Sequence, residues 1–203
     1  MREIAVDYLK NLRDSINSAE SQFEAQSDQN ALQMQISILR QQADNAAAKA
    51  AAQDPDAERE FHGMIPLAIS EVNEARMNLN AEYESVSNLL SKLPPGFKPL
   101  RDQLPTAKST IDKTDTAAQS LLTMKTTTEA QHYANTRLAL VIYVSAELPL
   151  VILGGVTVDE AKKIEDAAET LIRFCNRLVC GLVAAGAILG AYAAWLTMKE
   201  GDE

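Results

Sequence analysis

Aromatic residues are scarce in this sequence, at 5% of its 203 residues, although hydrophobic residues make up 46%. Alanine and leucine therefore supply most of the apolar volume, which is typical of helices that pack closely along their lengths. Eight glycines and seven prolines are too few for the many tight turns of an all-β protein. These scarcities predict an all-α fold, and we expect an elongated helical bundle or coiled-coil body.

Clustered positive charge is also missing. The chain has 19 basic and 28 acidic residues, a net charge of −9, and no segment concentrates Lys and Arg. Binding to phosphates needs such clusters, so we expect no nucleic-acid partner. The first residues, MREIAVDYLKNLRDS, contain no continuous apolar stretch, so no secretory signal peptide is expected.

The residues of catalytic and metal sites are few. There are two histidines and two cysteines, and the cysteines lie five apart on one predicted helix, where they cannot pair. Glu129 and His132 form a single E-x-x-H, whereas a helical di-iron site needs two copies and further carboxylates. Glu58 and His62 are spaced as an ordinary surface pair on a helix. No phosphate-binding loop, dinucleotide fingerprint, nucleophile elbow or CxxC is present. We therefore expect no enzyme activity, cofactor, metal or small-molecule substrate.

Helical spacing of apolar residues dominates the first two thirds of the chain. It predicts amphipathic helices over about 2–52, 57–92 and 106–135, with a proline-rich break at 93–105. Long helices joined by proline-containing turns favour a bundle of antiparallel neighbours. Residues 1–135 are therefore predicted to form one amphipathic helical domain.

The segment 178–198, LVCGLVAAGAILGAYAAWLTM, contains no charged residue. As a helix of about 1.5 Å per residue it would span about 31 Å, close to the roughly 30 Å of a hydrocarbon core. Trp195 lies near one end, as interfacial aromatics do. Gly186, Gly190 and Ala194 form a stripe of small residues along which another helix can approach closely. The alternative is the buried core helix of a soluble bundle.

The segment 138–158, LALVIYVSAELPLVILGGVTV, is equally long but carries Glu147 near its centre and Pro149 two residues later. Three interpretations stay open: a kinked transmembrane helix, a β-hairpin with its turn at AELP, and a buried helix of a soluble core. The charged segment 159–177 is predicted to be a helix linking the two apolar segments. Residues 136–203 together are predicted to be a hydrophobic, membrane-interacting region.

The segment 83–110, YESVSNLLSKLPPGFKPLRDQLPTAKST, contains a Tyr…LP..F……LP pattern. With a gap, this pattern resembles that of the N-terminal helical domains of fungal immune receptors. The sequence departs from the pattern before and after these residues. The resemblance implies a bundle that acts in cell death.

These features predict a non-catalytic, membrane-anchored helical protein that acts as a structural or interaction subunit and oligomerises through its C-terminal helices. The expected partners are membrane lipid and other helices, and the bulk of the chain is expected in the cytoplasm because basic residues precede the 178–198 span. The alternative is a soluble helical pore-forming toxin or cell-death effector that inserts its hydrophobic hairpin into membranes. The residues predicted to contact membrane or partner helices are Glu147, Pro149, Gly181, Gly186, Gly190, Ala194 and Trp195.

Overall fold

The computed structural model describes the backbone of residues 2–24 and 29–200, and the side chains of residues 6–23 and 29–177. Within these ranges every element is helical and there is no strand, which confirms the predicted all-α class. The elements are α1 (Arg2–Glu24), α2 (Gln29–Ala51), α3 (Pro55–Lys92), the 3₁₀ turn η1 (Pro95–Phe97), α4 (Lys98–Arg101), α5 (Leu104–Thr123) and α6 (Glu129–Glu200).

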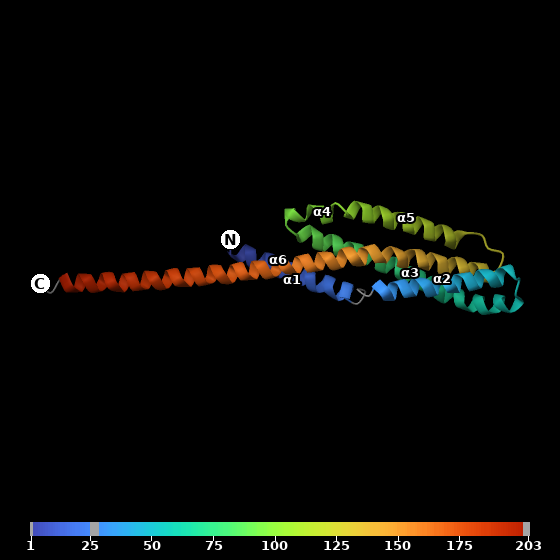
Figure 1. The fold of residues 1–203 in the computed structure, drawn as a ribbon, viewed down its shortest axis with the longest axis horizontal. Helices are drawn as coiled ribbons and strands as arrows, with labels where there is room; N and C mark the ends of the chain where they lie inside the picture. The colour runs from blue at the N-terminus through green and yellow to red at the C-terminus, as the bar shows by residue number, and fades with distance from the viewer. Residues whose placement is uncertain (1, 25–28, 201–203) are drawn as a thin grey trace.

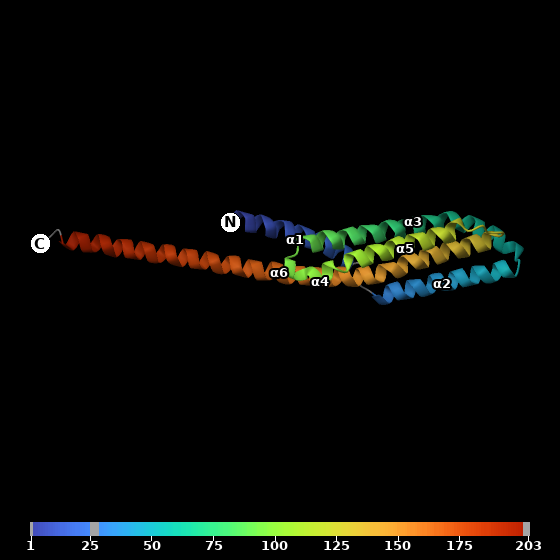
Figure 2. The ribbon, with the colours of Figure 1, turned by 90° about the horizontal axis from the view of Figure 1, so that it is seen from above.

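Two helix boundaries differ from the prediction. The single helix expected over 2–52 is two helices, α1 and α2, which lie roughly end to end in both views (Figures 1 and 2). The helix expected over 106–135 ends at Thr123, and α6 begins only at Glu129. Between them the chain turns, and the Thr128 hydroxyl accepts a hydrogen bond from the Gln131 amide at 3.1 Å. A side chain that caps the first turn in this way favours a new helix over continuation of the old one.

The turn before α3 also uses a capping carboxylate. Asp54 is the N-cap, and its side chain accepts a hydrogen bond from the backbone N–H of Asp56 at 3.0 Å. Pro55 follows at the first helical position, where its missing N–H leaves no bond unmade. Pro66 lies inside α3, which continues through it without a break.

At the other end of α3, Arg101 holds the proline-rich turn. Its guanidinium donates from Nε to the Leu90 carbonyl at 2.9 Å and from Nη2 to the carbonyls of Leu93 and Pro94. These carbonyls belong to the helix terminus and the turn. Those of Leu90 and Pro94 also accept backbone hydrogen bonds from Leu93 and Phe97, at 3.3 and 3.1 Å, so Arg101 adds a second donor to each. A short chain segment can therefore reverse from α3 into α5 through η1 and α4.

Helix α6 is the centre of the molecule, because α1, α2, α3 and α5 all pack against it (Figures 1 and 2). Helix α3 runs parallel to α6: Glu58 contacts Glu129 near one end, and Glu71 contacts Arg137 further along. The core forms three successive clusters along this axis. The middle cluster is made by α2, α3 and α5 around the α6 residues Ala139, Leu140, Val141, Tyr143, Val144, Ala146, Leu150 and Val151.

This packing decides how segment 138–158 folds. It is a continuous helix, so the β-hairpin interpretation is wrong, and Pro149 lies within that helix. The stretch 129–177 contains a window long and apolar enough to cross a membrane, with a mean hydropathy of 2.0, but 61% of that window is buried against other helices. The segment therefore fits the third interpretation, a core helix surrounded by its neighbours.

The C-terminal part of α6 leaves the bundle. The helix runs unbroken across residues 135 and 136, where the sequence suggested a domain boundary, and across 159–177. Both views show its last part extending past the N-terminus of α1 with no other described helix alongside (Figures 1 and 2). Bundle core and C-terminal extension are thus one rod of 72 residues.

Candidate functional site

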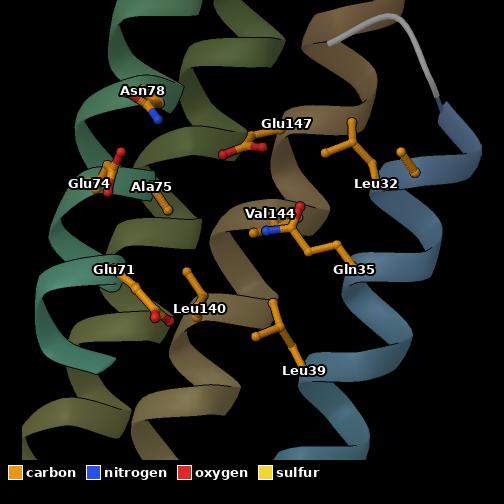
Figure 3. A pocket seen from close by; sticks show the side chains of 11 residues that line it. Leu32, Gln35, Leu39, Glu71, Glu74, Ala75, Asn78, Leu140, Val144 and Glu147 are labelled. Carbon is orange, nitrogen blue, oxygen red and sulfur yellow. The ribbon is translucent and has the colours of Figure 1, made fainter. Parts of the chain in front are cut away.

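A groove open to solvent lies between α2 and α3, with α6 as its floor (Figure 3). Its volume is about 560 Å³, which is within the range of small-molecule binding clefts. The residues that line it are Ala31, Leu32, Gln35, Leu39, Glu71, Glu74, Ala75, Asn78, Leu140, Val144 and Glu147. We refer to this set as the α2–α3–α6 groove.

Helical spacing explains how the groove is built. On α6, Leu140, Val144 and Glu147 follow at intervals of four and three residues, which places them on one face. On α3, Glu71, Glu74 and Asn78 have the same kind of spacing and form a polar edge. This edge was missed from the sequence, although the repeated spacing of Glu71, Glu74 and Asn78 beside an apolar stripe was a usable signal.

Glu147 lies at the bottom of the groove with 8% of its surface exposed. Burial raises the pKa of its carboxyl from 4.5 to about 8, and the nearby charge of Glu82 on α3 adds to the effect. Glu82 is itself fully buried. Within the described part of the chain, Glu147 makes no hydrogen bond or ion pair. This buried carboxyl is thus held mostly uncharged at neutral pH.

Arg137 closes the groove at the end where Glu71 lies. Its guanidinium is buried, pairs with the Glu71 carboxylate, and donates from Nε to the Tyr133 hydroxyl at 2.8 Å. A second cavity of about 340 Å³ continues the groove past Arg137, and both are lined by Ala31, Gln35, Leu39 and Glu71. Because the charge of Glu71 is matched by Arg137, Glu74 and Glu147 are the carboxyl groups of the groove that have no cationic partner among the described residues.

On the other side of α6, an ion pair and a hydrogen bond join three helices. Arg76 of α3 pairs with Asp115 of α5 at 2.6 Å, and the fully buried Tyr143 of α6 donates its hydroxyl proton to the same carboxylate at 2.7 Å. Asp115 thereby fixes the position of α5 against both α3 and α6. These contacts fix the position of α6, and with it the face that carries Leu140 and Val144.

Pro149, the other predicted contact residue in the described part, does not reach this groove. It lines a separate cavity of about 270 Å³ between α5 and α6, together with Leu150 and Leu153. The remaining predicted contact residues lie where only the backbone of α6 is described, and their side chains fall outside the described residues: Gly181, Gly186, Gly190, Ala194 and Trp195.

The histidine and carboxylate residues noted in the sequence make contacts between helices and not within their own pairs. Glu58 accepts a hydrogen bond from the Glu129 amide at 2.8 Å, and His62 Nδ1 lies 3.2 Å from a Glu129 carboxylate oxygen. These residues therefore join the start of α6 to α3. Across the described residues, no group of three or more His, Cys, Asp or Glu side chains could hold a metal ion.

Comparisons with protein-family models, with curated proteins and with solved structures find no match to this chain.

Proposed function

We propose that this protein is a non-catalytic, membrane-anchored helical subunit, in which α6 joins an interaction bundle to a lipid-embedded helix. The observation that carries the proposal is the continuity of α6, which leaves the bundle core and runs on through the uncharged segment 178–198 without a break. A helix that extends into water with 21 uncharged residues would expose a large apolar surface, and lipid or another apolar helix would cover it.

The proposed membrane boundary agrees with the end of the bundle. Among the residues whose side chains are described, Glu169 and Arg173 form the last ion pair along α6, and Arg13 of α1 also contacts Glu169. Arg177 then precedes the uncharged segment. Basic residues at this flank support a cytoplasmic location for the bundle in this proposal.

Self-association is the role proposed for the anchor segment. Gly186, Gly190 and Ala194 recur every fourth residue, so their small side chains share one stripe of the helix. In lipid, where water does not drive helices together, such stripes permit the close backbone approach that stabilises helix pairs. The bundle would then be displayed in two or more copies at the membrane surface.

Membrane partition tests this proposal with three forms of the chain. We expect the full chain to stay in the membrane pellet after alkaline carbonate extraction, and a chain that ends at Arg177 to be released. The shortened chain keeps α1 to α5 and the part of α6 that they contact. Full-length Ile188→Asp should also be released, because an acid at a span centre costs about 2.5–3.5 kcal/mol on insertion scales.

A charge change on the surface of the bundle, away from the proposed span, serves as the control. Asp44 is exposed on α2, so Asp44→Asn should partition like the unchanged chain. Extraction of the full chain into the soluble fraction without detergent would overturn the proposal.

The alternative is a helical pore-forming or cell-death protein that inserts on activation. One observation favours it: segment 138–158, apolar enough to cross a membrane, is held inside the bundle. That hypothesis also needs 178–198 to be covered by the bundle, whereas this part of α6 extends away from it (Figure 1). Dye release from liposomes by the purified chain would favour the alternative, and intact liposomes at every pH tested would count against it.

A further inference from the structure

We propose that the α2–α3–α6 groove binds an aliphatic diammonium ion, with one ammonium group against Glu147, the other against Glu74, and the carbon chain over Leu140 and Val144. This ligand goes beyond membrane anchoring and beyond the lipid and helix partners expected from the sequence.

The carboxyl of Glu147 points to a ligand because of where it lies. It is more than nine-tenths buried, it lines the groove, and it has no hydrogen bond or ion pair within the described chain. Figure 3 shows its carboxyl group between α6 and α3, facing the space above Val144. Burying a polar group without a partner is unfavourable, and a buried carboxylate is favourable only beside a counter-charge. A cation that enters the groove supplies that counter-charge.

The register of α3 and α6 sets the length of the ligand. Glu71 pairs with Arg137, and the two helices run parallel from there. Glu74 lies three residues beyond Glu71 on α3, and Glu147 lies ten residues beyond Arg137 on α6. The Glu58–Glu129 contact gives a smaller offset, with Glu147 about two residues beyond Glu74 along the axis. At about 1.5 Å per residue, the two contacts put the axial separation of Glu74 and Glu147 between about 3 and about 10 Å. Aliphatic chains of three to seven carbons between two ammonium groups cover this range.

The remaining lining residues favour a primary ammonium ion with an aliphatic body. Leucine, valine and alanine side chains form the middle of the groove, while Gln35 and Asn78 offer amide oxygens at its edges. Primary ammonium groups donate up to three hydrogen bonds, which carboxylates and amide oxygens can accept. No aromatic residue lines the groove, so it lacks the ring faces that recognise quaternary ammonium ions.

The raised pKa of Glu147 is consistent with such a ligand. Burial and the charge of Glu82 disfavour the carboxylate form, and a bound ammonium group would favour it. On the α3 side of the groove, the carboxylate of Glu71 is paired with Arg137. The α2 residues that line the groove include no titratable side chain.

Isothermal titration of the full chain, held in a non-ionic detergent, with the diamines from 1,3-diaminopropane to 1,7-diaminoheptane tests the proposal. We expect saturable binding of one diamine per chain, and a loss of affinity of about tenfold or more in Glu147→Gln and in Glu74→Gln, because each removes one charge-assisted contact. Glu147→Gln removes a buried acid that has no partner, so the variant should keep its fold, which circular dichroism checks. Asp44→Asn, with the same charge change at an exposed site on α2, should bind the diamine as the unchanged chain does.

Two further amines and magnesium ion test whether the binding is specific. Heptylamine should bind at least about tenfold more weakly, since it lacks the second ammonium group. Diaminoethane is shorter than every diamine of the series and should bind more weakly than the best of them. Equal loss in all three variants, or displacement of the diamine by millimolar magnesium, would mean attraction to the net negative charge and would overturn the proposal. Absence of binding, or equal affinity for heptylamine, would overturn it as well.

Discussion

Helix α1 approaches α6 closely at one glycine, Gly154, and replacing it gives a sharp test of this packing. Gly154 of α6 faces the ring of Phe23 on α1, which is 3% exposed. A Cβ atom at Gly154 would lie 2.6 Å from Cδ1 of that ring, and closer still to Cε1 and Cζ. Side-chain carbons essentially never approach closer than 3.0 Å. The ring must therefore move if Gly154 becomes alanine.

The neighbouring glycine supplies a matched control. A Cβ atom at Gly155 meets nothing within 4 Å, so Gly155→Ala should only gain helix propensity and raise the free energy of unfolding by about 0.5–1 kcal/mol. Gly154→Ala has the same gain, but overpacking in a core costs about 1–3 kcal/mol. We expect Gly154→Ala to lower the free energy of unfolding by about 1–2 kcal/mol after the propensity gain.

The assay is urea denaturation of the chain that ends at Arg177, followed by circular dichroism, which gives the midpoint and slope for each variant. A third variant identifies the cause. Phe23→Ala alone should cost about 3–5 kcal/mol, because a buried ring is lost. In that background Gly154→Ala should become stabilising, because the ring that it would strike is gone. Amide exchange should show faster opening of α1 in Gly154→Ala.

Equal stabilisation by Gly154→Ala and Gly155→Ala would refute the reasoning, because it would show that Phe23 does not pack against Gly154. The same conclusion would follow if Gly154→Ala remained destabilising to the same degree after Phe23→Ala.

Two further predictions concern the core of the bundle. The pKa of Glu147 is raised from 4.5 to about 8 in the folded chain. Between pH 4.5 and 8 the folded state therefore binds more protons than the unfolded state. The free energy of unfolding should fall over this range as the pH rises, by up to a few kcal/mol. Glu147→Gln should remove most of that slope in urea titrations at several pH values, and an unchanged slope would contradict this. Asp115→Asn removes the negative charge between Arg76 and Tyr143 and should cost about 1–3 kcal/mol, while the pKa of Tyr143, raised by burial and by Asp115, should fall in absorbance titrations. A pKa that rises or stays unchanged in Asp115→Asn would show that the carboxylate does not act on this hydroxyl.

The fold class was predictable because it depends on local properties. The stripe of apolar residues along α3, with prolines at both ends, predicts a helix over 57–92, close to its observed limits, Pro55–Lys92. The break between α1 and α2 was not predictable by periodicity, because similar apolar spacing continues on both sides of it.

The groove was only partly predictable. Glu147 is conspicuous as a single acid within an apolar segment, and its burial follows from that position. Glu74 and Gln35 look like ordinary surface residues of amphipathic helices, and only packing of α2, α3 and α6 brings them to one cavity. Side chains that are far apart in sequence cannot be assigned to one site from helical spacing alone, because spacing fixes a face and not the helix that lies opposite.

The two apolar segments of α6 also could not be told apart from the sequence. Hydropathy and length do not distinguish 138–158 from 178–198, since both are long enough to cross a bilayer. The difference lies in what surrounds them: four helices pack on the bundle part of α6, and in the described chain none accompanies the last part. Glu147 is consistent with the first environment, where protein can hold a protonated carboxyl at lower cost than lipid.

The continuity of α6 also has a mechanical consequence for a membrane-anchored bundle. At about 1.5 Å per residue, its 72 residues give a rod of about 108 Å. Neither a turn nor a proline interrupts it between Pro149 and Glu200, so the tilt of the proposed anchor sets the tilt of the bundle. Inserting Gly-Gly between Arg177 and Leu178 should leave the urea midpoint of the bundle unchanged, because α1 to α5 contact α6 before that point. It should nevertheless loosen the orientation of the bundle in oriented bilayers, measured by spin-label spectroscopy at Cys175, which is exposed. An orientation as narrow as that of the unchanged chain would show that contacts other than α6 hold the bundle to the membrane.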